Sequence, residues 1–264
     1  MIMAGACSPV QRSFVKDLVI KQYPKVAVVV PTYNESDCLP ALIDMLQTLD
    51  LPNLRVLIVD DNSPDGTGVI ADKFAATAPE RIGVLHRAAK DGLGRAYVAG
   101  MSRALDEGAE IVVQMDADLS HPVSVIPTMI AVLQSTTASV VIGSRYVAGG
   151  LTAADWPWHR KALSVWANRY VNAILRLGVR DATAGFKAWH AATLQDIGLG
   201  SIQSNGYSFQ VEMNYRAIRR GHRIVEVPIQ FVERAQGASK MSMRVQLESA
   251  ATPWRLRLGH TPYY

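Results

Sequence analysis

Two aspartates, Asp116 and Asp118, stand directly after an apolar run at residues 111–115. Side chains two positions apart in an extended chain face the same way, and open α/β sheets bind ligands at the carboxyl ends of their strands. Two carboxylates placed there repel each other unless a cation lies between them. Because Mg²⁺ usually bridges one or two carboxylates to substrate phosphates, the pair predicts a metal-assisted site for a nucleotide-bearing substrate. The alternative for an isolated D-x-D is that Asp118 or Ser120 only caps the helix that Pro122 opens.

Two further polar segments follow predicted strands, at residues 31–35 and 60–67. An aromatic ring at the carboxyl edge of a sheet, such as Tyr33, can pack against a base or ribose. A carboxylate after the second strand can accept hydrogen bonds from a ribose or a base N–H. Either segment taken alone could instead be a strand-to-helix turn with a capping residue.

The chain contains neither G-x-x-x-x-G-K nor G-x-G-x-x-G, so no glycine-rich loop is available to hold a diphosphate. The negative charge of a diphosphate must then be met by a metal ion and by cationic side chains. Arginine suits bidentate phosphate contacts, whereas lysine acts as a point charge. The available cations in irregular segments are Arg145, Arg160, Lys161, Arg234 and Lys240.

Strand-like and helix-like patterns alternate along most of the chain, which predicts βαβ units and a mainly parallel sheet. The apolar runs are nearly continuous, so we expect helices on both faces of that sheet. Residues 1–24 are predicted to be an extension with a short helix over 14–21. Strands are predicted at 26–30, 55–59, 82–86, 110–115, 139–143, 183–190 and 223–232, the last near a sheet edge because of Pro228. Helices are predicted at 41–49, 66–76, 93–107, 122–133, 161–177 and 208–220.

The composition favours one α/β domain: the chain has 264 residues, of which 49% are hydrophobic. No apolar run is long enough to cross a bilayer, and the first residues do not resemble a secretion signal, so we expect neither a membrane span nor export. Cys7 and Cys38 are too few for a disulfide framework or a zinc site, which fits a cytoplasmic protein. The formal charge is +4, and residues 234–264 carry five Lys/Arg against one Glu, also +4. This basic tail predicts contact with anionic lipid ahead of nucleic acid, with plain solubility as the alternative.

Taken together, the motifs resemble those of the dolichol (polyprenol) phosphate mannose synthases, family 2 glycosyltransferases of GT-A fold. The resemblance covers about residues 25–245, and the combination is specific although each member is weak. Its members are Pro31-Thr32-Tyr33-Asn34-Glu35, Asp60-Asp61-Asn62-Ser63-Pro64-Asp65-Gly66-Thr67, Met115-Asp116-Ala117-Asp118-Leu119-Ser120-His121, Gly143-Ser144-Arg145-Tyr146, and Phe231-Val232-Glu233-Arg234 with Ser239-Lys240.

The resemblance implies a role for each of several matching positions. The guanosine of GDP-mannose would be bound by Pro31, Tyr33, Glu35, Val59 and Asp61. Asp116 and Asp118 would hold Mg²⁺ or Mn²⁺ and the diphosphate, with Ala117 alongside. Arg234 and Lys240 would clamp the donor phosphates from a closing loop. The phosphate of the lipid would be received by Arg145, Arg160 and Ser164.

The implied reaction is an inverting transfer of mannose to a polyprenyl phosphate, which needs no general base because the acceptor phosphate is already a nucleophile. Glu212 is expected to be structural. We expect a catalytic domain over 25–240 and a basic amphipathic tail over 241–264. That tail, with or without a membrane-anchoring partner protein, would hold the enzyme on the cytoplasmic face of a membrane. Two alternatives remain open: a polyprenol-phosphate glucosyltransferase that uses UDP-glucose, and a noncatalytic nucleotide-binding subunit.

Overall fold

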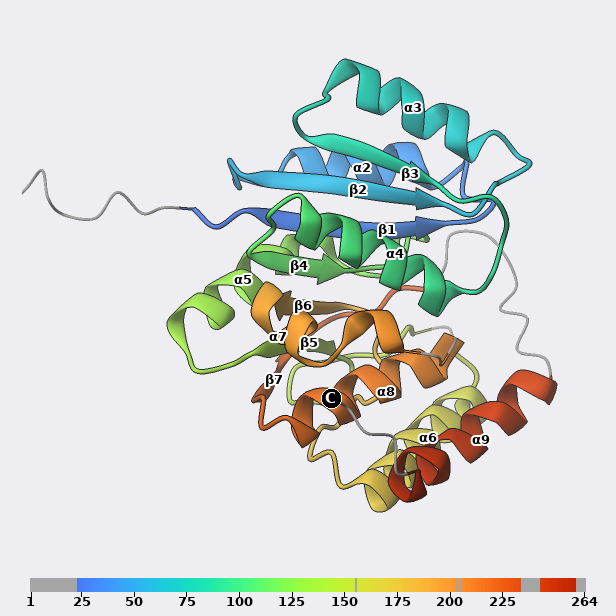
Figure 1. The fold of residues 1–264 in the computed structure, drawn as a ribbon. Coiled ribbons are helices and arrows are strands. Elements are labelled where there is room, and N and C mark those ends of the chain that lie inside the picture. Colours follow the sequence, from blue (N-terminus) through green and yellow to red (C-terminus); the bar gives the residue numbers. More distant parts are fainter. Residues whose placement is uncertain (1–22, 155, 203, 205, 234–242, 260–264) are drawn as a thin grey trace, which may run out of the picture.

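The computed structural model describes residues 23–154, 156–202, 204, 206–233 and 243–259. These residues form one seven-stranded sheet in the order β3-β2-β1-β4-β6-β5-β7, with helices on both sides (Figure 1). The strands are β1 (Val26–Thr32), β2 (Leu54–Asp60), β3 (Ile82–His86), β4 (Ile111–Gln114), β5 (Val140–Ser144), β6 (Lys187–His190) and β7 (Ile224–Pro228). The helices are α2 (Leu39–Gln47), α3 (Thr67–Thr77), α4 (Leu93–Asp106), α5 (Ile126–Ser135), α6 (Trp158–Leu175), α7 (Ala191–Asp196), α8 (Gly206–Arg219) and α9 (Met243–Leu258), with short 3₁₀ turns at Val123–Val125 and Leu199–Ser201.

The sheet is mainly parallel, as the alternation of strands and helices predicts. β1 pairs in parallel with β2 and β4, β2 with β3, and β5 with β7, whereas β6 runs antiparallel to β4 and β5. β7 lies at a sheet edge, as expected from Pro228. The reversed direction of β6 follows from the path of the chain after α6, for which the sequence offers no signal.

Two hydrophobic cores lie on opposite faces of the sheet, which confirms that helices cover both. Alternate residues of β1 divide between them: Ala27 and Val29 face the core that contains α4, α6, α7 and α8. Val26, Val28 and Val30 face the core under α2, α3 and α5. The nearly continuous apolar strands arise because each face of the pleat is buried.

The close packing of α4 on the sheet depends on Gly100. A Cβ at this position would lie 2.5 Å from Val29 Cγ1 and 2.6 Å from Val59 Cγ2. Only glycine therefore allows α4 to approach β1 and β2 this closely. This approach places Tyr97, one turn earlier on α4, underneath the carboxyl end of β4, where its hydroxyl meets Asp116.

The structure differs from the predicted elements at several places, and the strand predicted at 223–232 ends at Pro228 as β7. The strand predicted at 183–190 is shortened to β6, because the chain makes a turn in which the Ala184 N–H donates to the Asp181 carbonyl oxygen (3.3 Å). The helix predicted from 122 begins as a 3₁₀ turn. The six-residue helix α7 was not predicted, and no side chain caps its first turn to mark it in the sequence. The helix predicted at 14–21 lies outside the described residues.

The predicted basic tail, residues 241–264, is helical where the structure describes it, as α9. In α9, Trp254 and Leu258 are exposed while Leu256 is buried in the core next to α8. Leu256 therefore does not share an outward face with Trp254 and Leu258, because a helix repeats every 3.6 residues and not every two. Within the described part of the chain, no helix combines the length and apolarity needed to cross a bilayer.

Candidate functional site

The polar segments singled out in the sequence meet at one edge of the sheet, where β2, β1 and β4 end side by side. Each segment turns sharply after its strand through a residue in the left-handed region: Asn34 (φ 58°), Asn62 (φ 58°) and Leu119 (φ 61°). Asparagine tolerates this conformation, but for leucine it is strained. The strained turn at Leu119 is held by Asp118, whose Oδ1 accepts from the Ser120 N–H (3.1 Å) and hydroxyl (2.6 Å).

A group of charged and aromatic side chains lies at the ends of β1, β2 and β3. Asp61 is buried and forms an ion pair with Arg87, which follows β3. Burial raises the pKa of the Asp61 carboxyl, an effect that the guanidinium of Arg87 partly offsets. Next to this pair, the ammonium of Lys90 lies 3.7 Å from the ring centre of Tyr33. The group offers a flat aromatic face and a buried carboxylate, both suited to a nucleobase.

Two neighbouring aspartates instead shape the loops. Asp60 is buried and accepts hydrogen bonds from the hydroxyls of Thr32 (3.2 Å) and Ser63 (2.6 Å). Asp65 binds the N–H and the hydroxyl of Thr67 at the start of α3. Partial burial alone would raise the pKa of Asp65, but the hydrogen bonds from Thr67 and from Ser36 lower it to about 2. The alternative of a capped strand-to-helix turn is therefore correct for Asp65, although the same segment also presents Asp61.

Asp116 is fixed from two sides. The hydroxyl of Tyr97 donates to its Oδ1 (2.7 Å), and its backbone N–H donates to Nδ1 of His121 (3.2 Å). Burial, and then the charge of Asp116, raises the pKa of Tyr97 well above its ordinary value, so the phenol stays protonated and donates. Burial lowers the pKa of His121, which favours the neutral ring that can accept at Nδ1.

The other oxygen of Asp116 faces a glycine. A Cβ at Gly185 would lie 3.3 Å from Asp116 Oδ2, so a larger residue would crowd this oxygen. No side chain caps the 3₁₀ turn that follows Pro122 or the helix after it. Helix capping by Asp118 or Ser120, the alternative explanation for the D-x-D pair, is therefore wrong.

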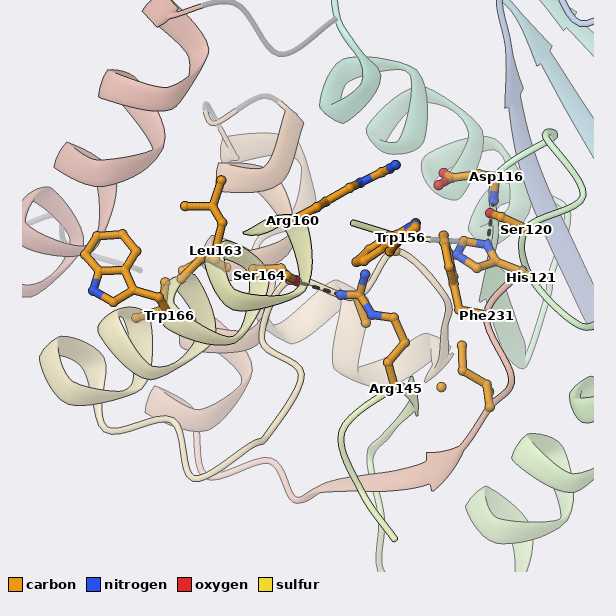
Figure 2. Close-up of a pocket in the computed structure, with 18 of the residues that line it drawn as sticks. Asp116, Ser120, His121, Arg145, Trp156, Arg160, Leu163, Ser164, Trp166 and Phe231 are labelled. Carbon is orange, nitrogen blue, oxygen red and sulfur yellow. Dashed lines mark hydrogen bonds between the residues drawn. The ribbon is translucent and has the colours of Figure 1, made fainter. Parts of the chain in front are cut away.

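Asp116 and Asp118 open into a cavity of about 330 Å³ that extends between α6, α8 and the end of β7. Figure 2 shows Arg145, Trp156 and Arg160 in the middle of this cavity, between Asp116 on one side and Leu163 and Trp166 on the other. The part beyond the arginines is lined mostly by apolar side chains of α6 and its neighbours, including Leu163, Trp166, Ala167, Tyr170, Val171 and Val211. The cavity thus has an acidic end, a cationic middle and an apolar end.

The three residues predicted to receive a lipid phosphate all line this cavity. Arg145 makes a bidentate pair with the fully buried Asp181 (2.8 and 2.7 Å) and donates to Thr183. Arg160 pairs with Glu233 (2.8 Å) and lies 4.3 Å from the ring centre of Trp156. Ser164 accepts a hydrogen bond from the Tyr146 hydroxyl (2.6 Å).

The remaining predicted site residues lie in different environments. The side chains of Val59 and Ala117 are buried in the two hydrophobic cores, so only their backbone could meet a ligand. Pro31 is buried at the end of β1, and Glu35, partly exposed, has its N–H bound to Thr67 (3.0 Å). Arg234 and Lys240 lie outside the described residues.

Several residues that shape the site were not predicted, among them Arg87, Lys90, Tyr97 and Asp181. Arg87 and Lys90 follow β3 at the same sheet edge, so their position after a predicted strand was an available signal. No sequence signal marked Tyr97 or Asp181, because their roles depend on how α4 packs and on the path of the loop before β6. Glu212 is structural, as expected, since it is buried and paired with Arg216.

Among the described residues, no three His, Cys, Asp or Glu side chains come together as a complete metal site. The available donors are carboxylate oxygens of Asp116 and Asp118 at the open acidic end of the cavity. Such a partial set of hard oxygen donors fits a divalent ion that takes its other ligands from substrate phosphates and water.

Comparison with known proteins relates the whole arrangement to one family. The pattern of the family described as "Glycosyl transferase family 2" matches residues 27–198. The chain is 43% identical over 223 residues to the polyprenol monophosphomannose synthase of Mycolicibacterium smegmatis, covering 84% of this chain and 83% of that protein. It is 46% identical over 234 residues to the undecaprenyl-phosphate mannosyltransferase of Micrococcus luteus, covering 88% of this chain and 94% of that protein.

Solved structures share the fold at lower identity. One is glucosyl-3-phosphoglycerate synthase from Mycobacterium tuberculosis in complex with Mn²⁺, UDP and phosphoglyceric acid (TM-score 0.67, 18% identity, 89% of this chain and 79% of that chain). Another is a mannosyltransferase from Pyrobaculum calidifontis in complex with GDP-Man and Mn²⁺ (TM-score 0.55, 21% identity, 88% of this chain and 62% of that chain). At these identities the likeness establishes the fold alone, and it agrees with the expected GT-A architecture.

Proposed function

Because the chain belongs to glycosyltransferase family 2, we propose that it transfers mannose from GDP-mannose to a polyprenyl phosphate, with inversion at the sugar. The observation that carries this proposal is the single cavity that joins the acidic pair, the two arginines and an apolar end. A polyprenyl phosphate has the matching character, an anionic head attached to a long hydrocarbon. The names of the two mannosyl-transferring relatives support the same acceptor and sugar.

On the donor side, the guanosine lies against the group formed by Tyr33, Asp61, Arg87 and Lys90. A buried carboxylate such as Asp61 can accept hydrogen bonds from the N–H groups of guanine. Arg87 keeps that carboxylate in place through the ion pair. The ring of Tyr33 packs against the base or the ribose. The ammonium of Lys90, which covers one face of this ring, then moves aside or stays on the ring beside the nucleoside. Asp60 and Asp65 hold the surrounding loops and do not contact the donor.

At the acidic end, Asp116 and Asp118 would hold Mg²⁺ or Mn²⁺ next to the donor diphosphate. The bound ion supplies positive charge that stabilises the departing GDP. The structural neighbours with Mn²⁺ support divalent metal use in this fold. Tyr97 and His121 orient Asp116 by binding its Oδ1 and its backbone N–H, which leaves Oδ2 directed past Gly185.

On the acceptor side, Arg145, Arg160 and Ser164 face the lipid phosphate. Asp181 sets the plane of the Arg145 guanidinium by a bidentate contact, and the stack on Trp156 sets that of Arg160. An oxygen of the acceptor phosphate attacks C1 of mannose, and the bond from C1 to the GDP oxygen breaks, its electron pair leaving with GDP. Attack opposite to the leaving group gives the β-linked product. No general base is needed, because a phosphate monoester carries about −1.5 to −2 charge near neutrality.

Arg234 and Lys240 remain predicted donor-phosphate contacts. The enzyme is further proposed to work at the cytoplasmic face of a membrane, with or without a membrane-anchoring protein, since its acceptor is a membrane lipid. Nucleic acid is not among the proposed partners.

The decisive experiment offers purified protein a short polyprenyl phosphate, Mg²⁺ and either GDP-mannose or UDP-glucose, and reads the product by mass. We expect the mannosyl lipid from GDP-mannose at a rate at least tenfold above that from UDP-glucose. Preferential glucosyl transfer would instead support the polyprenol-phosphate glucosyltransferase. Absence of any glycolipid with either donor would support the noncatalytic nucleotide-binding subunit.

A further inference from the structure

Four large apolar side chains on two neighbouring helices are exposed, and two of them, Leu163 and Trp166, also line the apolar end of the cavity. Trp158 is 80% exposed, Leu163 54% and Trp166 57%, all within the first half of α6, and Trp254 of α9 is 49% exposed. We propose that these four side chains form a docking surface, here called the α6–α9 surface, that inserts into the headgroup region of an anionic lipid bilayer. The inference deepens the proposed function and rests on it for the identity of the acceptor.

The α6–α9 surface is continuous across the two helices. Figure 1 shows α6 and α9 side by side at the end of the molecule opposite α3. Trp166 stacks on Tyr170 with ring centres 5.1 Å apart, and Nε1 of Trp254 donates to the Tyr170 hydroxyl (3.0 Å). That hydroxyl in turn donates to the carbonyl oxygen of Ala250 (2.8 Å). Tyr170 therefore links the aromatic side chains of α6 to those of α9.

The contacts of α9 show that it supports this surface from behind and does not act as a detached anchor. Thr252 and Leu256 are buried, and the Thr252 hydroxyl donates to Ser208 of α8 (3.1 Å). The Arg257 guanidinium donates to the carbonyl oxygen of Ile174 in α6. A helix that is fastened to both α6 and α8 presents only its outer side chains to a membrane, Trp254 among them.

The position of the cavity favours a bilayer over a protein as the partner of the α6–α9 surface. Leu163 and Trp166 line the cavity and are also more than half exposed, so they form its rim. A prenyl chain that leaves the cavity there would expose its hydrocarbon to water unless the rim lay against a bilayer. The rim must therefore face the hydrocarbon in which the rest of the lipid is dissolved.

Charge and composition also match a lipid surface. Arg169 on α6 and Arg255 on α9 are exposed, and Lys161 is partly exposed, next to the tryptophans. Tryptophan with lysine or arginine is the usual composition of helices that lie in the interface of anionic membranes. Basic residues at this position are attracted to the negative surface of such a membrane.

The test measures flotation of the full chain with protein-free vesicles of phosphatidylglycerol and phosphatidylcholine. We expect the wild type to bind, and the double variant Trp158→Ser/Trp254→Ser to bind at least tenfold more weakly. The matched control is Met45→Ser/Val69→Ser, which removes two exposed apolar side chains from α2 and α3 on the far face of the sheet. The control should bind as the wild type does, and melting temperatures should confirm that both variants fold.

Equal vesicle binding by the tryptophan variant and the wild type would overturn the proposal, as would failure of the wild type to bind vesicles without an added membrane protein. A second measurement separates this outcome from failure of the proposed function. Trp158→Ser should transfer mannose to a short, water-soluble polyprenyl phosphate at the wild-type rate, because Trp158 does not line the cavity. Loss of transfer in the wild type would refute the proposed function, whereas vesicle binding would still report on the docking surface.

Discussion

At the scale of single residues, the site depends on how Asp116 is oriented. Tyr97 is fully buried, and its hydroxyl donates a hydrogen bond to Asp116 Oδ1. Its ring stacks on that of Phe209, with 5.9 Å between the ring centres. A hydrogen bond to a charged group contributes about 1.5–3 kcal/mol. The tyrosine thus positions the carboxylate without reaching the substrate itself.

Removing this hydroxyl should therefore weaken metal binding and transfer together. We expect Tyr97→Phe to lower the affinity for Mn²⁺ in the presence of GDP, and the rate of transfer, by roughly tenfold or more. Electron paramagnetic resonance of Mn²⁺ gives the affinity independently of activity. Tyr215→Phe, in the same core but on α8, is the matched control. An unchanged Mn²⁺ affinity in Tyr97→Phe would show that Asp116 is not held through its Oδ1.

Asp61 and the acceptor roles of Arg145 and Arg160 came from the resemblance to the mannose synthases, whereas residue types and spacing alone singled out the acidic pair and Tyr33. These residues follow strands directly, and parallel strands bring their ends to one edge. The role of Asp181 could not be predicted from the sequence. Its partner Arg145 lies 36 positions away in the chain, and the loop that brings the two together has no recognisable sequence pattern. The same holds for Tyr97, whose importance appears only once Gly100 has let α4 approach the sheet.

At the scale of elements, the contact between β6 and α8 contains a buried lysine. Lys187 is completely buried and donates from Nζ to the carbonyl oxygen of Gln210 (3.1 Å). Beside it, the amide of Gln114 donates to the side-chain oxygen of Gln210 (2.8 Å). Burial lowers the pKa of Lys187 to about 7, although the charge of Asp181 acts in the opposite direction.

This lowered pKa has a consequence for stability. The unfolded chain holds the Lys187 proton up to its ordinary pKa of 10.5, whereas the folded chain releases it near 7. Between these values the unfolded state binds more protons, so this group makes stability rise with pH, by at most about 1.4 kcal/mol per pH unit. The contribution is least favourable below pH 7. We expect Lys187→Met to flatten the rise in stability between pH 7 and 10.

Urea unfolding of the wild type and of Lys187→Met, at several pH values in this range, gives the difference directly. Subtracting the unfolding free energy of the variant from that of the wild type removes the contribution of the other groups that titrate in this pH range. Lys161→Met, a partly exposed lysine on α6, should leave the slope unchanged. Parallel stability curves for the wild type and Lys187→Met would mean that the buried lysine keeps its proton throughout.

The sequence predicted most elements because apolar runs and turn residues alternate clearly up to residue 145. One of the errors falls where the chain lines the cavity. The strand predicted from 183 begins only at Lys187, since the turn at Asp181 carries Thr183, Ala184 and Gly185 along the cavity wall. Helix α9 was not predicted, because residues 241–264 were expected only to form a basic amphipathic tail of unspecified secondary structure.

At the scale of the whole molecule, binding of metal and of donor should be strongly coupled. No group of three metal-ligating side chains occurs among the described residues, so in the proposed function the donor diphosphate would complete the ligands that Asp116 and Asp118 supply. GDP with Mn²⁺ should therefore stabilise the fold, whereas Mn²⁺ alone should have little effect. With ligand at about 100 times its dissociation constant, stabilisation is about 2.7 kcal/mol, or roughly 5–10 °C in melting temperature.

Thermal unfolding with GDP, with Mn²⁺ and with both measures this coupling, and UDP with Mn²⁺ tests the choice of base. An equal shift from Mn²⁺ alone would indicate a complete protein site that does not need the nucleotide. An equal shift from UDP would remove the support for guanosine at Tyr33 and Asp61.

The most direct test of the account compares the wild type with Asp118→Asn, which keeps the size of the side chain and an oxygen for the hydrogen bonds from Ser120. Both proteins receive GDP-mannose, Mg²⁺ and a short polyprenyl phosphate, and the mannosyl lipid is quantified by mass. The account predicts product from the wild type and at least a hundredfold less from the variant, at equal melting temperature. Similar amounts of product from both proteins would contradict it.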